Sequence, residues 1–286
     1  MLFRSVNKAI FYGFLTGTIM QFCIVIAQLI LKHAMQGPLY YLGERAINMS
    51  MAGVAKVSLN GVELLRPYGT FSHPNSLAGF YLLLFAFYLV SEHIKVRGIF
   101  RIMLLVLCSL LVLFSFSKVA LISLVVINVM YLVYKWDDYK ECWLCLIARC
   151  AVPAVLIALF LPAQGDLLTI DKRIGLAQNA FIIILAHPLF GVGLGNYVIA
   201  QHAFKNPYPY FFAQPVHNIA LLTVAQIGIP ATVLLSLMVL RARRHIRYLY
   251  VAPFIITAVL FTGMFDHYWL TLQQNILIMA VLFALI

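Results

Sequence analysis

The feature that most constrains this sequence is a series of long apolar runs, separated by short segments that carry basic residues. A run of about 20 apolar residues is long enough to cross the ~30 Å hydrocarbon core of a bilayer. The first run follows Arg4 and Lys8 and lacks an A-x-A-like cleavage site, so we expect a retained span rather than a signal peptide. The eight candidate spans cover residues 9–31, 75–91, 102–117, 118–134, 143–162, 216–240, 249–264 and 269–286.

The scarcity of charge supports a membrane location. Only 10% of the 286 residues are Asp, Glu, Lys or Arg, and 64% are hydrophobic, whereas a soluble domain has roughly 25% charged residues. The same composition excludes a disordered chain, a collagen, a coiled coil and a disulfide scaffold. We therefore predict an all-α polytopic membrane protein with about eight transmembrane helices, forming a single integral membrane domain over residues 1–286.

The basic residues predict the orientation of the chain. There are 20 Lys and Arg against nine Asp and Glu, but they occur in short clusters between apolar runs rather than in the single patch of a nucleic-acid-binding protein. By the positive-inside rule these short segments are cytoplasmic. Both termini are then cytoplasmic, and two long loops, residues 32–74 and 163–215, lie on the outer side.

The first outer loop contains the pattern of a small β-hairpin. Residues 55–59 and 62–64 read as short strands, and Asn60-Gly61 between them supplies the positive φ angles of a type I′ turn. The polar segment RPYGTFSHPN, residues 66–75, follows directly and leads into the second span.

The second outer loop predicts an amphipathic helix that begins with Asp171 as its N-cap and ends before Pro188. Such a helix would lie on the membrane surface with its apolar side down. Its apolar positions recur at helical spacing: Ile174, Ala177, Phe181 and Leu185. The glycines that follow have G-x-G-x-G spacing without a βαβ unit or a Lys-Ser/Thr pair, which argues against nucleotide binding. They favour tight turns or close backbone approach.

Arg66 and Arg173 are the strongest individual candidates for a functional site. Both fall on the predicted outer side, against the positive-inside bias, and both adjoin membrane segments. A guanidinium group stays charged and binds phosphate through paired donors, so two of them suit a diphosphate. Alternatively, each extends to lipid phosphate or pairs with a nearby acid, Glu63 or Asp171.

His217 lies at the mouth of a span and is flanked by Gln214 and Asn218. An imidazole can accept a proton from a sugar hydroxyl or orient that hydroxyl, although a hydrogen bond to a loop carbonyl is the simpler alternative. Asp266-His267, at the last outer turn, could be an orienting pair or ordinary residues of a membrane-interface turn.

The remaining polar residues limit the classes of function. His73 and Asn75 are expected to cap the second span, with ligand contact as the second interpretation. Cys142, Cys145 and Cys150 form one CxxC pair plus a third cysteine, without the second pair that a zinc site needs, so we predict no metal and no cofactor. Ionisable residues are nearly absent inside the spans, which disfavours an ion-coupled transporter or a channel.

With these residues placed, the sequence resembles the O-antigen ligase and polymerase superfamily of bacterial envelope glycosyltransferases. The resemblance extends over about residues 50–286. Four segments carry it through their order and their common side of the membrane: residues 66–75, RPYGTFSHPN; residues 173–196, ending in HPLFGVGLGN; His217-Asn218; and residues 265–274, FDHYWLTLQQ.

The resemblance implies a glycosyltransferase C-like helical fold in the bacterial inner (plasma) membrane and a donor glycan carried on undecaprenyl diphosphate. It also implies transfer without a required metal or nucleotide sugar. Arg66 and Arg173 would hold the diphosphate, and His217 would be the acid/base or orienting residue at the acceptor. The expected substrate-binding residues are His73, Asn75, Gln214, Asn218, Asp266 and His267.

The predicted activity is transfer of the glycan to a lipid, glycan or protein acceptor outside the cytoplasm, in surface polysaccharide biosynthesis. Two alternatives remain: an O-antigen-type polymerase that joins repeat units, and a non-catalytic transporter or scaffold for lipid-linked saccharide.

Overall fold

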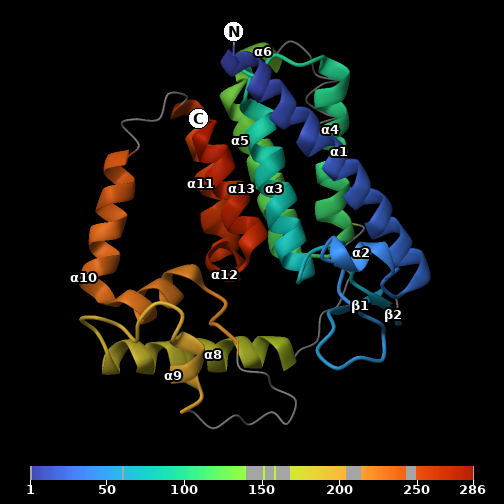
Figure 1. The fold of residues 1–286 in the computed structure, drawn as a ribbon. Coiled ribbons are helices and arrows are strands. Elements are labelled where there is room, and N and C mark those ends of the chain that lie inside the picture. The colour runs from blue at the N-terminus through green and yellow to red at the C-terminus, as the bar shows by residue number, and fades with distance from the viewer. Residues whose placement is uncertain are drawn as a thin grey trace.

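The computed structural model describes residues 2–59, 61–139, 168–203, 214–242 and 249–285, together with residues 151 and 158. The described chain is almost entirely helical, with one small β-hairpin (Figure 1). The predicted span over residues 143–162 and the three cysteines Cys142, Cys145 and Cys150 fall outside the described residues, apart from the two single positions.

A bundle of antiparallel helices forms the main body of the protein (Figure 1). Its central helix, α3 (Pro74–Val90), is buried at nearly every position because it is apolar on all sides. The surrounding elements are α1 (Leu2–Leu31), α4 (Gly98–Phe114), α5 (Lys118–Tyr134), η2 (Leu249–Val251), α11 (Ala252–Gly263) and α13 (Gln273–Ala284). A short helix, α6 (Trp136–Tyr139), follows α5.

Each predicted apolar run that the structure describes is mostly helical. Two helices are long and apolar enough to cross a membrane by length and composition, over Val6–Leu31 and Ile219–Arg241. Helices α3, α4 and α5 have 17 residues each, which corresponds to ~25 Å. The run predicted over residues 269–286 is interrupted, because α12 (Tyr268–Thr271) ends before α13 begins and Leu272 between them is extended.

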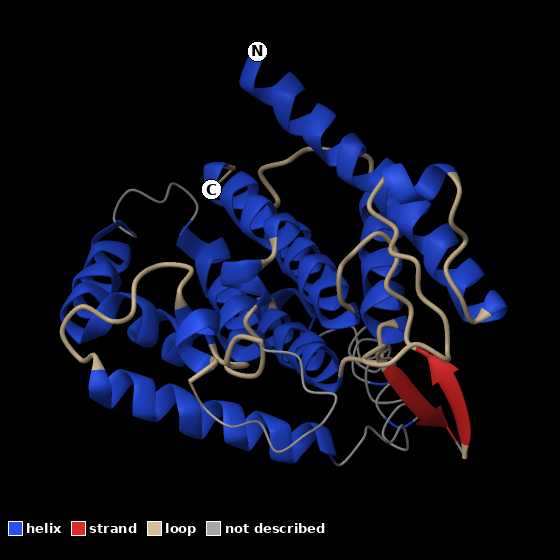
Figure 2. Cartoon of the chain, turned by 60° about the horizontal axis from the view of Figure 1, so that its bottom comes forward, coloured by secondary structure: helices blue, strands red, loops and turns tan. Residues whose placement is uncertain are grey.

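The predicted hairpin is present. Strand β1 (Lys56–Leu59) pairs antiparallel with β2 (Val62–Leu65), with Leu59 opposite Val62 (Figure 2). Gly61 in the connecting turn has a φ of 83°, a backbone conformation that favours glycine. Helix α2 (Pro38–Tyr41), which the sequence did not predict, lies earlier in the same loop.

The predicted amphipathic helix is α8 (Leu168–Ala186), followed by α9 (Tyr197–Gln201) and α10 (Ile219–Ala242). The predicted N-cap is wrong: α8 begins three residues before Asp171, which lies in its first turn, where a carboxylate is favourable next to the helix dipole. Ala180 and Ile183 of α8 are buried in a cluster with side chains of α9 and α10, and Leu176 is also buried. Three of the four predicted apolar positions are exposed: Ile174, Phe181 and Leu185. Contact of this face with a membrane stays a prediction.

Helix α10 is broken at Gly228, so the predicted span over residues 216–240 is not one continuous helix. Gly228 has φ 78° and ψ 170°, and Pro230 follows in the first turn of the second part. The backbone N–H of Ile229 donates to the carbonyl of Pro188 at 2.8 Å. In Figure 1 the first part of α10 runs beside α8 and the second part turns away from it.

The glycine-rich loop 188–193 occupies this break. The backbone N–H groups of Val192 and Gly193 donate to the carbonyls of Ala225 and Gln226, both at 2.9 Å. A Cβ added at Gly191 would lie 2.5 Å from the Gln226 carbonyl carbon. These contacts confirm the prediction that the glycines permit close backbone approach.

The two ends of the bundle differ. The start of α1 and helix α6 lie at one end, which we call the basic end because the predicted cytoplasmic segments join the helices there (Figure 1). The hairpin and helices α2, α8 and α12 lie at the other, which we call the site end. The alternation of helix directions therefore collects the described parts of both predicted outer loops at one end.

Candidate functional site

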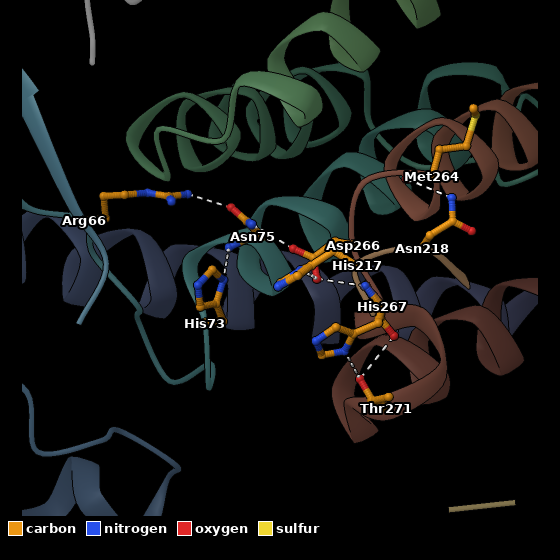
Figure 3. Close-up of polar contacts among 9 residues, drawn as sticks. All are labelled: Arg66, His73, Asn75, His217, Asn218, Met264, Asp266, His267 and Thr271. Carbon is orange, nitrogen blue, oxygen red and sulfur yellow. Dashed lines mark hydrogen bonds and ion pairs between the residues drawn. The ribbon is translucent and has the colours of Figure 1, made fainter. Parts of the chain in front are cut away.

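The candidate site lies at the site end, where four segments distant in sequence meet (Figure 3). Each segment is positioned by the start or end of an apolar element. The fold brings together Arg66 from the segment after β2, and His73 and Asn75 from the start of α3. It adds His217 from the segment before α10, and Asp266 and His267 from the turn between α11 and α12.

Asp266 is the centre of this cluster. Its Oδ2 accepts a hydrogen bond from Asn75 Nδ2 at 2.7 Å, and its Oδ1 accepts one from the backbone N–H of His267 at 2.8 Å. His217 Nδ1 lies 3.4 Å from the same Oδ1. Burial alone would raise the pKa of Asp266, but the contact with His217 and the positive charge that the neighbouring histidines carry at acid pH lower it well below its usual range. Asp266 is therefore a buried carboxylate that faces His217.

Arg66 belongs to the same network through Asn75. Its Nη2 donates to Asn75 Oδ1 at 2.6 Å, and its Nε donates to the backbone carbonyl of Ser115, between α4 and α5, at 2.9 Å. Burial, together with the charge of Arg173, lowers the pKa of Arg66 to about 10, so the guanidinium is still charged at neutral pH. Asn75 thus links a half-buried cation to the buried carboxylate Asp266.

The alternative partner that the sequence offered for Arg66 is engaged elsewhere, since Glu63 forms an ion pair with Lys56 across the hairpin at 3.5 Å. Arg173 lies on the first turns of α8. Its charge lowers the pKa of both Arg66 and His267. Its Nε is buried without a hydrogen-bond partner in the described part of the chain. Two arginines, one of which has this unpaired N–H donor, could together bind an anion that carries several oxygens, such as a diphosphate.

His73 and His267 have structural hydrogen bonds. His73 Nδ1 accepts from the backbone N–H of Asn75 at 3.1 Å, which confirms His73 as the predicted cap of α3. The prediction that Asn75 also caps this helix is wrong, because its side chain bonds to Arg66 and Asp266 instead. His267 Nδ1 lies 2.7 Å from Thr271 Oγ1. Burial lowers the pKa of His73 to about 3 and that of His267 to about 4, so both rings are neutral at pH 7.

His217 and its flanking residues lie just before α10. The rings of His217 and His267 have centroids 5.1 Å apart. Asn218 Nδ2 donates to the backbone carbonyl of Met264 at 3.1 Å, and Asn218 Oδ1 accepts from the backbone N–H of Leu221 at 3.0 Å. Asn218 therefore joins the start of α10 to the end of α11, while Gln214 is half-buried three residues before His217.

Three side chains of the cluster could hold a metal ion. Each of them offers one ligand atom, and these three atoms lie within 4.8 Å of one another: the residues are His217, Asp266 and His267. Both oxygens of Asp266 already accept hydrogen bonds, so a metal would compete with Asn75 and with the backbone of the turn. Metal-independent transfer stays a prediction.

The sequence did not identify the polar residues of α1 that hold the Arg66 segment. Gln28 is fully buried; its Oε1 accepts from the backbone N–H groups of Tyr68 and Gly69 at 2.9 and 2.8 Å, and its Nε2 donates to Glu44 at 2.9 Å. Two helical turns earlier on α1, the side chain of Gln21 donates a hydrogen bond to Thr70. The seven-residue spacing of the two glutamines places them on one face of an apolar helix, a signal that could have indicated this role.

A family model described as O-antigen ligase matches residues 77–236, more than half of the chain. The chain belongs to the O-antigen ligase family. A comparison with curated proteins finds no match. The resemblance inferred from the sequence is thereby confirmed, and membership implies a membrane protein with a role in surface polysaccharide processing, glycosyltransferase activity and lipid-linked glycan substrates.

The region matched to the O-antigen ligase family contains Arg173 and His217 but not the other charged residues of the cluster. Arg66 and Asp266 lie before and after it. The fold brings them to the same place, since Asn75 contacts both.

Proposed function

We propose that the protein transfers a glycan from an undecaprenyl-diphosphate carrier to an acceptor on the extracytoplasmic side of the bacterial inner membrane. The observation that carries this proposal is the pairing of two arginines with a buried His217–Asp266 contact at one end of an apolar helical bundle. The arginines can bind the diphosphate of the donor, and the histidine can accept a proton from the hydroxyl of the acceptor.

Arg66 and Arg173 would bind the diphosphate. As the glycosidic bond breaks, negative charge develops on the departing diphosphate, and two fixed guanidinium groups stabilise that charge. Arg66 is held by Asn75 and Ser115, so little reorganisation is needed when the donor binds. The polyprenyl chain would lie along the apolar helices.

His217 would activate the acceptor. Its Nδ1 faces Asp266, which leaves Nε2 for the acceptor hydroxyl. In the transfer step, the hydroxyl oxygen bonds to the anomeric carbon, its proton moves to His217 Nε2, and the bond from the anomeric carbon to the diphosphate oxygen breaks with its electron pair. Asp266 stabilises the imidazolium that forms and fixes the ring orientation, as an orienting carboxylate does in hydrolytic triads.

This proposal includes an integral membrane domain of the glycosyltransferase C type over residues 1–286, with both termini cytoplasmic. The alternation of helices that separates the basic end from the site end supports it (Figure 1). His73, Gln214, Asn218 and His267 would border the bound glycan. The acceptor is a lipid in a ligase and a second repeat unit in a polymerase, so the product of the purified protein distinguishes the two.

The direct test supplies purified protein with a polyprenyl-diphosphate-linked oligosaccharide and an acceptor, in the presence of a chelator. His217→Ala should retain donor binding and lose product, whereas Arg173→Ala should weaken donor binding. The matched control is His187→Ala, which changes an exposed histidine at the end of α8 and should leave transfer normal.

Donor binding without product from the unmodified protein, with any acceptor, would support the non-catalytic carrier instead. Activity that is lost with the chelator and restored by a divalent metal would contradict metal independence.

A further inference from the structure

Helix α9 carries two buried polar side chains whose polar atoms have no hydrogen-bond partner among the residues that the structure describes. Tyr197 is 1% exposed and Gln201 is 5% exposed. Within the described residues, Tyr197 Oη and both Gln201 Oε1 and Nε2 lack a hydrogen bond. Buried side-chain amides and hydroxyls are nearly always hydrogen-bonded in native proteins, so three such atoms on one short helix require an explanation.

The two side chains lie in the same unit as the proposed reaction residues. Tyr197 belongs to the same buried cluster as Ala180 of α8 and Val216, the residue before His217. Ala180 is seven positions after Arg173 on α8, which places both on the same face of that helix. Tyr197 and Gln201 are four positions apart and share one side of α9, which lies against α8 and α10 (Figure 1).

The chemistry of the unpaired atoms identifies the class of ligand. The amide of Gln201 offers two donors and an acceptor, and the hydroxyl of Tyr197 offers one donor and an acceptor. Burial raises the pKa of Tyr197, so the hydroxyl is neutral and remains a donor. Neutral donors and acceptors side by side match sugar hydroxyl groups, which also donate and accept, rather than a phosphate or a metal ion.

We propose that Tyr197 and Gln201 form a subsite that binds sugar hydroxyls of a glycan beside the diphosphate site. The glycan is either the acceptor or the sugar of the donor, and both present the same chemistry. Binding would satisfy atoms that the described residues leave unpaired, which gives discrimination against ligands lacking those hydroxyls. The inference rests on the proposed glycan transfer.

Tyr197→Phe and Gln201→Met test the subsite by removing the polar atoms while keeping the size of the side chains. Each should raise the Michaelis constant for one glycan about tenfold, the loss expected of one hydrogen bond, with little change in kcat. A rise for the acceptor alone assigns the subsite to the acceptor, and a rise for the donor alone assigns it to the donor. Unchanged constants for both substrates would overturn the proposal.

Tyr88→Phe is the matched control, because Tyr88 Oη in α3 is also buried without a partner among the described residues but lies in the bundle rather than in the α8–α9–α10 unit. It should leave both Michaelis constants unchanged. Thermal unfolding should show that all three variants remain folded, since each removes an unsatisfied polar group from an apolar environment.

A binding measurement separates this subsite from the proposed transfer reaction. The probe is the free oligosaccharide released from the lipid-linked donor, observed by saturation-transfer NMR with the detergent-solubilised protein. If the unmodified protein shows no transfer but binds the oligosaccharide, and both variants lose that binding, the subsite stands and the proposed function fails. If transfer occurs and neither variant changes binding or kinetics, the function stands and the subsite fails.

Discussion

Asp266 connects three segments through side-chain and backbone contacts, and its proposed role is to orient His217. Asp266→Asn keeps the shape of the side chain but removes the negative charge and one acceptor oxygen. We expect kcat to fall about 100-fold, within the range of a lost acid–base contribution, while the dissociation constant of the donor changes little. Steady-state kinetics and donor binding on the same preparation measure both quantities. Asp171→Asn, an exposed carboxylate on α8, is the control, and equal kcat values in the two variants would remove Asp266 from the mechanism.

His73 makes the stability of the protein depend on pH. Its pKa is about 3 in the folded protein, against about 6.5 for an unperturbed histidine. Below pH 6.5 the unfolded chain therefore binds a proton that the folded protein does not, so stability is complete above this pH and falls as the pH decreases toward 3. His267, whose pKa is about 4, acts in the same direction.

The corresponding variant is His73→Asn, because asparagine also caps helices well but does not titrate. The thermal unfolding midpoint in detergent should fall less between pH 7 and pH 5 in this variant than in the unmodified protein. His187→Asn should leave the pH dependence unchanged. A slope in His73→Asn as steep as that of the unmodified protein would show that His73 does not contribute.

At the scale of elements, the contact between the 188–193 loop and the break in α10 should tolerate no side chain. A Cβ at Gly228 would lie 2.3 Å from the carbonyl oxygen of Leu189, and one at Gly191 would lie 2.5 Å from Gln226. We expect Gly228→Ala and Gly191→Ala to lower the free energy of unfolding by about 2–4 kcal/mol. Gly195 has a similar φ of 79° with no atom within 4 Å of an added Cβ.

Gly195→Ala therefore isolates the cost of the positive φ angle from the cost of the backbone contact. Chemical unfolding of the three variants in the same detergent gives the comparison. Equal destabilisation of all three would show that the contact between the loop and α10 does not contribute to stability.

Gln28 should position Arg66 through the backbone that follows it. Gln28→Leu would leave the buried N–H groups of Tyr68 and Gly69 without their acceptor, at about 1–3 kcal/mol for each group. The expected result is lower stability together with weaker donor binding, since the Arg66 segment is no longer fixed to α1. Unchanged donor binding by a folded Gln28→Leu variant would show that Gln28 does not position Arg66. Gln274→Leu, at an exposed position, should change neither property.

The elements themselves were largely predictable, and their interruptions were not. The apolar runs predict helices because burial of apolar side chains dominates their energetics, and Asn60-Gly61 predicts the hairpin through its turn conformation. The break in α10 depends instead on backbone bonds to Pro188 and Val192. Those bonds join the 188–193 loop to α10, and no local sequence pattern indicates that these two segments meet.

The candidate site was predictable as a set of residues but not as a network. The sequence identified Arg66, His217 and Asp266 as polar residues on one predicted side. It could not show that Asn75 bonds to Asp266, 191 positions away, because α3 is apolar on all faces and its pattern does not indicate which helices surround it. From the sequence alone, Asp266 is one possible binding residue rather than the centre of the cluster.

At the scale of the whole molecule, the proposed function requires the site end to face outward. Ser50, in the first long loop, is exposed at the site end, and Gly98, at the start of α4, is exposed at the basic end. With the five native cysteines replaced by alanine, a membrane-impermeant maleimide added to intact spheroplasts should label Ser50→Cys and not Gly98→Cys. An added Cβ at Gly98 meets no atom within 4 Å, so the second substitution fits the fold, and permeabilised cells should label both positions. The reverse labelling pattern would place Arg66, Arg173 and His217 in the cytoplasm and contradict transfer on the outer side.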